Sequence, residues 1–253
     1  MGTNFTDGRL SAGYDKRFYE MLVSFQKRLK QAEGNYSANN YSFLYPCIGK
    51  KLGGKKKLLV YSRFINGVWQ SMFDIKDNFR IDIIGDGSEL FRYGKPRDEI
   101  SKQDRNKVSP IETRQHLNHL VVVRKTAARI VGTGIDDKSD DWWNHIAFSN
   151  LFKIGNATGD LSDQNEYDAQ KGFAVELFLR ELHEIKSEVV LLLDGLDYSD
   201  DFIAALGLEP NVEGMDYVVV AAKVKDTKFV LTRSMIEDVD KCADEILSAI
   251  SRL

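Results

Sequence analysis

Polar and aromatic side chains follow two short apolar runs of the sequence. Phe64 and Trp69 come after the run 58–61, and Asn150 comes directly after the run 145–149. An Asn side chain offers one acceptor and a donor group, so Asn150 could bond to one edge of a nucleobase or an amide. Nearby aromatic rings such as Phe64 and Trp69 could stack on the face of that ring. The alternative role for Asn150 is a turn or cap bond to the local backbone.

Basic and hydroxyl side chains at the same kind of position could hold phosphate groups. Arg63 follows the first run, Lys153 follows the second, and Arg233 and Ser234 follow the run 229–232. Phosphate contacts from such residues supply much of the affinity for nucleic acid and make it salt-dependent. We therefore expect any binding of DNA to be modest and sensitive to salt.

Several carboxylates follow the apolar run 189–193 and could hold Mg²⁺ in a phosphoryl-transfer site, namely Asp194, Asp197 and Asp200. The alternative is that Ser199 caps a helix over 200–206 that ends at Gly207. Acidic residues in the first turn of such a helix would favour its dipole. Both interpretations stay open at the level of the sequence.

The motifs of the commonest enzyme classes are missing from the sequence. It has no glycine-rich phosphate loop ending in Lys-Ser or Lys-Thr, no H-E-x-x-H, no C-x-x-C and no G-x-S-x-G. His116 and His119 lie three residues apart, but no cysteine or carboxylate pattern completes a metal site around them. Apart from the magnesium alternative, we expect no metal and no other cofactor.

Five short apolar runs predict the strands that must position these residues: 58–61, 145–149, 189–193, 217–221 and 229–232. Continuous apolar runs bounded by turn residues are typical of strands buried on both faces of a parallel sheet. We expect four to six strands. Ligands bind outside the carboxyl ends of the strands in such sheets, which is why the residues after each run are the candidates.

Helical periodicity predicts an amphipathic helix over 14–31 and another over about 164–186. The second joins the runs 145–149 and 189–193, so these two strands should be parallel with a right-handed crossover. Two further helices should begin at the capping boxes 109–112 and 234–237. The stretch 33–56 is expected to be a loop.

The composition is that of a packed protein, with 253 residues of which 43% are hydrophobic. Neither a membrane span nor a signal peptide is visible, and Cys47 and Cys242 are the two cysteines, so we expect a cytoplasmic protein. Residues 1–132 carry a net charge of +11 and residues 133–253 carry −14. This asymmetry fits either a face that binds a polyanion or two halves that attract each other.

Two segments of the chain match short family motifs. Arg63-x-x-Asn66-Gly67, with Trp69 close behind, is similar to G-R-A-x-N-G-W, and residues 146–154 read I-A-F-S-N-L-F-K-I, similar to I-A-W-S-N-L-Y-K-I. Both motifs occur in a bacterial branch of the uracil-DNA glycosylase-like superfamily, which the chain resembles. The second is more distantly similar to the T-N-x-x-K of active glycosylases.

A third segment extends the resemblance along the chain. Gln170, then Glu184-Ile185, then residues 189–195 are similar to a helix and the third strand of that branch. The resemblance covers about residues 43–70 and 142–202, with weaker continuity to the C-terminus.

The resemblance implies a three-layer α/β/α sandwich with a central, mainly parallel sheet, uracil-DNA glycosylase-like in type. It would form one domain over 1–253, with an N-terminal helix and an irregular insertion at about 71–135. Asn150 would read a nucleobase flipped out of DNA. Asn66 would be the catalytic residue that positions the attacking water. Active relatives carry His-Pro-Ser after the last strand, whereas residues 232–235 of this chain read Thr-Arg-Ser-Met.

The sequence thus leads to one main expectation about function and two alternatives. The main expectation is a protein that binds DNA or a nucleobase, with weak N-glycosylase activity in DNA repair. The first alternative is a non-catalytic protein that binds a nucleotide or another small ligand, as the missing His-Pro-Ser loop favours. The second is a magnesium-dependent hydrolase built on the three aspartates named above.

Overall fold

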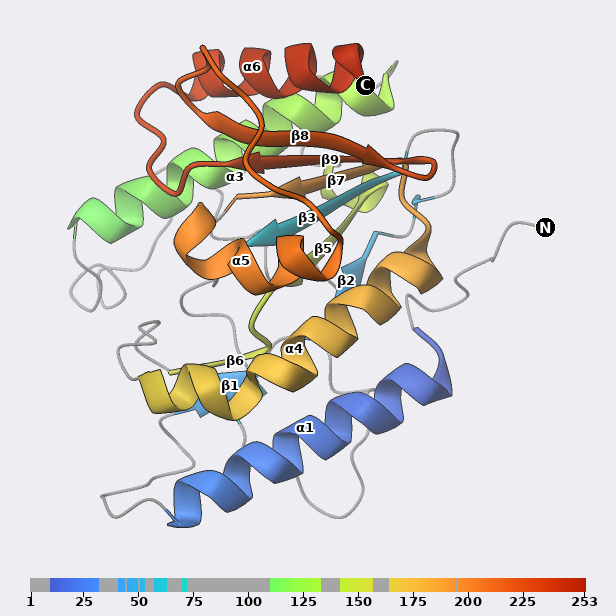
Figure 1. The fold of residues 1–253 in the computed structure, drawn as a ribbon, viewed down its shortest axis with the longest axis vertical. Helices are drawn as coiled ribbons and strands as arrows, with labels where there is room; N and C mark the ends of the chain where they lie inside the picture. Colours follow the sequence, from blue (N-terminus) through green and yellow to red (C-terminus); the bar gives the residue numbers. More distant parts are fainter. Residues whose placement is uncertain are drawn as a thin grey trace.

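A six-stranded mixed sheet forms the centre of the fold, with strand order β2-β5-β3-β7-β9-β8 (Figure 1). The computed structural model describes residues 10–31, 41–43, 45–49, 51–52, 57–62, 70–71, 110–132, 142–156, 164–193 and 195–253. The four inner strands are β5 (Ile146–Asn150), β3 (Leu58–Ser62), β7 (Val189–Leu192) and β9 (Thr227–Thr232). They are parallel to one another, and β2 (Cys47–Ile48) and β8 (Val218–Val224) pair antiparallel at the two edges.

The apolar runs of the sequence form these strands, as predicted. All residues of β3, β5 and β7 are buried, because both faces of the inner strands are covered. The strands predicted at 145–149 and 217–221 begin one residue later, at 146 and 218, and the second of them continues to 224. The strand predicted at 229–232 begins at 227, and the strand predicted at 189–193 ends at 192. Helix α4 connects β5 to β7, and these two strands are parallel, as predicted. They are not neighbours, because β3 lies between them in the sheet.

Helices cover both faces of the sheet, so the α/β class expected from the sequence is confirmed. On one face lie α4 (Gln164–Ile185) and α5 (Leu196–Ala205), with α1 (Ala12–Gln31) packed outside α4. The other face carries α3 (Pro110–Val131) and α6 (Val239–Arg252), and the short 3₁₀ helix η5 (Trp142–His145) precedes β5. Figure 1 shows α6 and α3 on one side of the strands and α5, α4 and α1 on the other.

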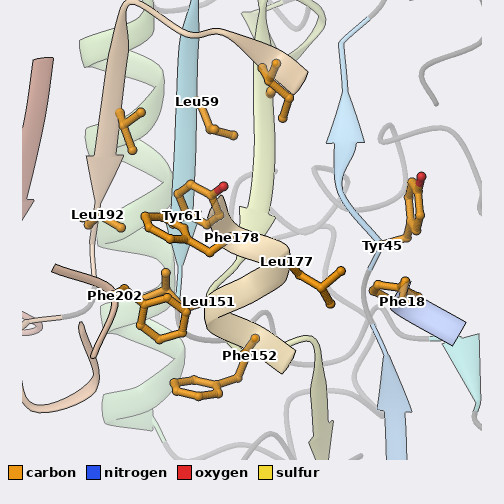
Figure 2. Close-up of a cluster of buried hydrophobic side chains, with 14 of the residues drawn as sticks. Phe18, Tyr45, Leu59, Tyr61, Leu151, Phe152, Leu177, Phe178, Leu192 and Phe202 are labelled. Atoms are coloured by element: carbon orange, nitrogen blue, oxygen red, sulfur yellow. The ribbon is translucent and has the colours of Figure 1, made fainter. Parts of the chain in front are cut away.

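Side chains of the strands alternate between the two faces. Leu59 and Tyr61 of β3 belong to the core under α4 and α1, whereas Leu58 and Val60 belong to the core under α3 and α6. Figure 2 shows the first core, in which the ring of Tyr61 packs edge-on against Phe178, with ring centroids 4.9 Å apart. This alternation fixes the face on which each strand-end residue lies.

Two segments expected to be irregular contain regular structure. The loop expected over 33–56 holds β2 and β1 (Tyr41–Phe43), and β1 forms a second sheet with β4 (Gln70–Ser71) and β6 (Ile154–Asn156). The insertion expected at about 71–135 includes α3, which begins at Pro110 as its capping box predicts and is a layer of the fold. Residues 72–109 lie outside the described ranges.

The other predicted helix starts are partly wrong. The helices predicted over 14–31 and 164–186 form as α1 and α4. However, α6 begins at Val239 with Asp238 as its N-cap, not at Ser234, because Ile236 is buried and its carbonyl accepts a hydrogen bond from Asn118. Likewise α5 begins at Leu196 after Gly195, so Ser199 lies inside the helix and is not its cap.

The helices of the described ranges include none that combines the length and apolar character needed to cross a bilayer.

Candidate functional site

Polar residues end three of the parallel strands at their carboxyl edge. Ser62 at the end of β3 and Asn150 at the end of β5 are partners in the strand register, and Thr232 ends β9. All three are buried. The pairing continues just past the strands, where the amide of Leu151 donates to the carbonyl of Ser62 over 3.1 Å. This edge is where ligands bind in open α/β sheets.

Asn150 is the residue at this edge whose side chain has the most unusual environment. It is 0% exposed, and neither its amide oxygen nor its amide nitrogen has a hydrogen-bond partner. Every other buried side chain without a full set of partners in the described part of the chain has one unpartnered polar atom, whereas Asn150 has two. The alternative of a turn or cap bond is therefore not what the structure has. An unpaired buried amide is costly, which favours a role that completes its bonding with a ligand.

Alternation along β5 places the Asn150 side chain on the α3 and α6 side of the sheet. Phe148 packs in the core on that side, whereas the hydroxyl of Ser149 accepts a hydrogen bond from Lys153 on the opposite side. By the same reasoning, Ser62 lies on the α3 side of β3, next to Asn150. The two residues thus form a polar pair at the end of an otherwise apolar face.

The loop after β9 lies against the loop after β7. The amide of Gly195 donates to the carbonyl of Thr232 over 2.9 Å, and Gly195 has a positive φ of 71°. A Cβ at Gly195 would lie 3.1 Å from the backbone nitrogen of Ser234, so the two segments approach as closely as a glycine allows. Arg233 and Ser234, the predicted phosphate ligands in this loop, are both exposed.

Helix α3 holds the loop after β9 from the other side. The side-chain amide of Asn118 donates to the carbonyl of Ile236 over 2.6 Å, and the Nε2 atom of His119 lies 2.9 Å from the carbonyl oxygen of Ser234. Burial lowers the pKa of His119, and its bond to Ser234 opposes that shift. A neutral ring donating its Nε2 proton to Ser234 fits this geometry. His119 therefore has a structural partner here.

Lys153, predicted to contact phosphate, is instead fully buried. Its ammonium lies 2.7 Å from the Oε1 atom of Glu181, donates to the Ser149 hydroxyl over 2.7 Å, and donates to the carbonyl of Asn150. A lysine ammonium has three N–H donors, and each of them is hydrogen-bonded to one of these three acceptors. In this conformation Lys153 has none left for a phosphate.

Glu181 is the centre of a buried polar network that sequence analysis missed. Its carboxylate also accepts hydrogen bonds from the hydroxyls of Tyr14 on α1, over 2.5 Å, and Tyr61 on β3, over 2.9 Å. Burial, followed by the nearby Glu181, raises the pKa of both tyrosines. Burial lowers the pKa of Lys153, and Glu181 opposes that shift. A carboxylate within the apolar stripe of α4, beside Leu177, Phe178 and Ile185, was the signal that could have revealed it.

Gln170 fixes the segment that follows Lys153. Its side-chain amide donates to the carbonyl of Ile154 over 2.8 Å and accepts from the amide of Ile154 over 3.0 Å. Because α4 supplies both Gln170 and Glu181, one helix holds the whole turn between β5 and β6. The turn carrying Lys153 is thus bound from the α4 side.

The remaining predicted site residues are only partly described. Arg63, Phe64, Asn66 and Trp69 lie outside the described residues. Asn150 and the loop of Ser234 belong to strands three positions apart in the sheet, about 14 Å by the usual strand spacing. The predicted base ligand Asn150 and the predicted phosphate ligands Arg233 and Ser234 therefore lie at separate strand ends.

The acidic alternative has little support from the described residues. Asp194 lies outside them, as does the side chain of Asp197, and Asp200 is exposed. The neighbouring Asp201 already binds the hydroxyl of Tyr167 and the ammonium of Lys171. The described side chains include no group of three or more histidines, cysteines or carboxylates that could hold a metal ion.

Comparisons with known proteins give no family for the chain. No protein-family model matches it, and no curated protein sequence matches it.

Proposed function

We propose that this protein binds a nucleobase-like group through Asn150. The group would be a planar ring with a donor and an acceptor side by side, as on the hydrogen-bonding edge of uracil or cytosine. The observation that supports the proposal is the buried Asn150 amide, unpartnered on both atoms at the carboxyl edge of a parallel sheet. Such an amide can accept from one atom of the base and donate to its neighbour. The resemblance of residues 146–154 to the base-reading segment of uracil-DNA glycosylase-like proteins points the same way.

Binding, rather than base excision, is the function proposed. An Asn side chain cannot accept a proton as a general base does, so Asn66 would be able only to orient water. Excision would further need phosphate contacts that hold the flipped nucleotide, and Lys153 is already bound by Glu181, Ser149 and Asn150. The proposal therefore corresponds to a nucleobase or nucleotide ligand, free or within a nucleic acid.

The first experiment titrates wild-type protein with uracil, thymine, cytosine, adenine, guanine and hypoxanthine by calorimetry. At least one base should bind. Asn150→Asp keeps the size of the side chain but replaces the amide donor by an acceptor. This should weaken binding of that base by about 5- to 150-fold, the equivalent of about 1–3 kcal/mol for an unmatched buried group.

Asn211→Asp is the matched control, because Asn211 is exposed and bonds only the backbone of the edge strand β8 through Ala221. It should bind the base as wild type does. Absence of binding both to all six bases and to the base-bearing oligonucleotides of the second experiment, or equal binding by wild type and Asn150→Asp, would refute the proposal.

A second experiment separates binding from catalysis. Oligonucleotides that carry a single uracil or hypoxanthine are incubated with the protein and scored for abasic sites. We expect binding without abasic sites, and we expect the affinity for DNA to fall as salt rises. Accumulation of abasic sites that disappears in Asn150→Asp would show that the protein is a glycosylase instead.

A further inference from the structure

The Asn150 side chain has no hydrogen bond of its own to hold it, so its position depends on its backbone. On one side, β5 is paired with β3, where the Leu151 amide donates to the Ser62 carbonyl. Hydrogen bonds of a parallel strand alternate between its two edges, so the carbonyl of Asn150 is directed to the opposite edge. There β2 pairs with β5 only as far as Phe148. No strand in the described part of the chain reaches the carbonyl of Asn150 on that side.

Lys153 occupies this place. Its ammonium donates to the carbonyl of Asn150 and to the hydroxyl of Ser149, and so binds the last two residues of β5 at once. The charge is balanced by Glu181, whose carboxylate lies 2.7 Å away and which is equally buried. The ammonium of the ion pair therefore supplies the hydrogen bond to the Asn150 carbonyl that the backbone N–H of a neighbouring strand would otherwise supply.

A buried ion pair is an expensive way to hold a backbone carbonyl. Apolar residues of similar volume often give equal or higher stability, so an ion pair at such a position is better explained by the geometry that it specifies. Here that geometry is the position of the Asn150 backbone, from which the recognising amide extends.

The network also reaches the N-terminal helix. The hydroxyl of Tyr14 on α1 donates to Glu181 over 2.5 Å, and Tyr61 on β3 donates to the other carboxylate oxygen. These two bonds fix the orientation of the carboxylate that holds Lys153. Tyr45 is the natural contrast, since its hydroxyl is close to the same helix but donates to Asp15, not to Glu181.

We propose that the Lys153–Glu181 pair is the positioning device for Asn150, and that α1 completes it through Tyr14. This inference rests on the proposed function for its account of what Asn150 recognises. The Tyr14 bond to Glu181 thereby links α1 to the base site, although α1 itself does not contact the ligand.

The test compares two kinds of variant. The first replaces the network by apolar groups, as Lys153→Met with Glu181→Met, Tyr14→Phe, Tyr61→Phe and Ser149→Ala, so that no buried charge or side-chain hydroxyl of the network is left without its partner. The second is Tyr14→Phe alone. Its matched control is Tyr45→Phe, which removes a tyrosine hydroxyl that bonds Asp15 of α1 and not Glu181. The side-chain amide signal of Asn150 is followed by ¹⁵N NMR and assigned by its loss in Asn150→Asp.

In the apolar variant we expect a cooperatively folded protein in which the Asn150 signal shifts or broadens. Uracil, or whichever base of the panel wild type binds most tightly, should bind about tenfold more weakly, as for loss of one charge-assisted hydrogen bond. Tyr14→Phe should move the Asn150 signal in the same direction, and Tyr45→Phe should not.

Either of two results would overturn the inference. One is a folded apolar variant whose Asn150 signal equals that of wild type. The other, which decides the matter if the apolar variant does not fold, is an equal effect of Tyr14→Phe and Tyr45→Phe on that signal. The NMR measurement needs no ligand. If wild type bound no base, free or within an oligonucleotide, the proposed function would be refuted, but the effect of the network on the Asn150 side chain could still be tested.

Discussion

The Nζ atom of Lys153 lies 2.7 Å from the Oε1 atom of Glu181, and both side chains are fully buried between β5 and α4. Each charge is tolerated there because of the other. Removing one partner leaves the second uncompensated in an apolar environment, which is far more costly than breaking a pair at the surface.

Glu181→Gln should therefore lower the free energy of unfolding by about 3–5 kcal/mol at pH 7. Denaturation by urea measures this loss. Glu176→Gln is the control, because the pair between Glu176 and Arg17 is partly exposed and worth at most about 1 kcal/mol. Equal losses in the two variants would show that Lys153 is not a buried charge that needs Glu181.

The loss in Glu181→Gln should shrink as the pH rises. Burial already lowers the pKa of Lys153, and without Glu181 nothing among its known partners opposes that shift by charge. The unfolded chain then holds more protons than the native one, up to the ordinary lysine pKa of about 10.4, so the free energy of unfolding rises with pH in that window. Urea titrations of wild type and variant at pH 7 and pH 9.5 check the sign.

Asn150→Leu should stabilise the protein while it abolishes binding of the base. The substitution removes two buried polar atoms that lack partners, whose cost is about 1–3 kcal/mol. Thermal denaturation and base titration on the same protein measure both effects. A marked decrease in melting temperature would mean that the Asn150 amide is bonded in solution and that the site is arranged differently.

Gly195→Ala should be more destabilising than Gly207→Ala. Both glycines have a positive φ, 71° and 67°, and Gly195 also has a ψ of 175°, a backbone conformation that is essentially restricted to glycine. At Gly207 a Cβ would meet nothing within 4 Å, whereas at Gly195 it would lie 3.1 Å from the backbone nitrogen of Ser234. The difference between the two losses, measured by urea denaturation, reports the close contact between the loops after β7 and β9 together with the strained backbone of Gly195. No difference would mean that this contact is loose.

Asp238→Ala should lower the free energy of unfolding by about 1 kcal/mol, because its carboxylate accepts from the amides of Asp240 and Lys241 at the start of α6. Ser234→Ala, at the start predicted from the sequence, should change stability by less than about 0.5 kcal/mol. Thermal denaturation compares the two. The reverse order would place the beginning of α6 four residues earlier than in the structure.

The strands and most of the helices could be predicted because their signals are local. The run 189–193 is apolar without interruption, and Pro110 follows a Ser with a Glu two residues later, so burial and capping agree with the observed elements. The start of α6 could not be predicted, since Ser234 and Glu237 mimic a capping box. A long-range bond from Asn118 to the carbonyl of Ile236 keeps that segment out of the helix.

The candidate site divides in the same way. Asn150 could be selected from its place after an apolar run, and the structure puts it at the expected edge of the sheet. The sequence predicts Lys153 to be a phosphate ligand, because it is a basic residue just after a strand. Its neighbours in the sequence do not show that its ammonium is hydrogen-bonded to Glu181 and Ser149. Such pairing depends on the distance between β5 and α4 in space, which periodicity does not encode.

The contact between Tyr14 and Glu181 joins residues 167 positions apart in the chain. During synthesis, α1 therefore leaves the ribosome long before the helix against which it packs has been made, on the order of ten seconds at usual rates of translation. Strand β3 meets the same delay, because both of its neighbours, β5 and β7, come from the second half of the sequence. The central strand and the first helix must consequently stay unpaired while the chain grows. Nascent chains truncated before residue 189 should thus expose apolar surface that chaperones bind, and slow folding with a high contact order follows from the strand order itself.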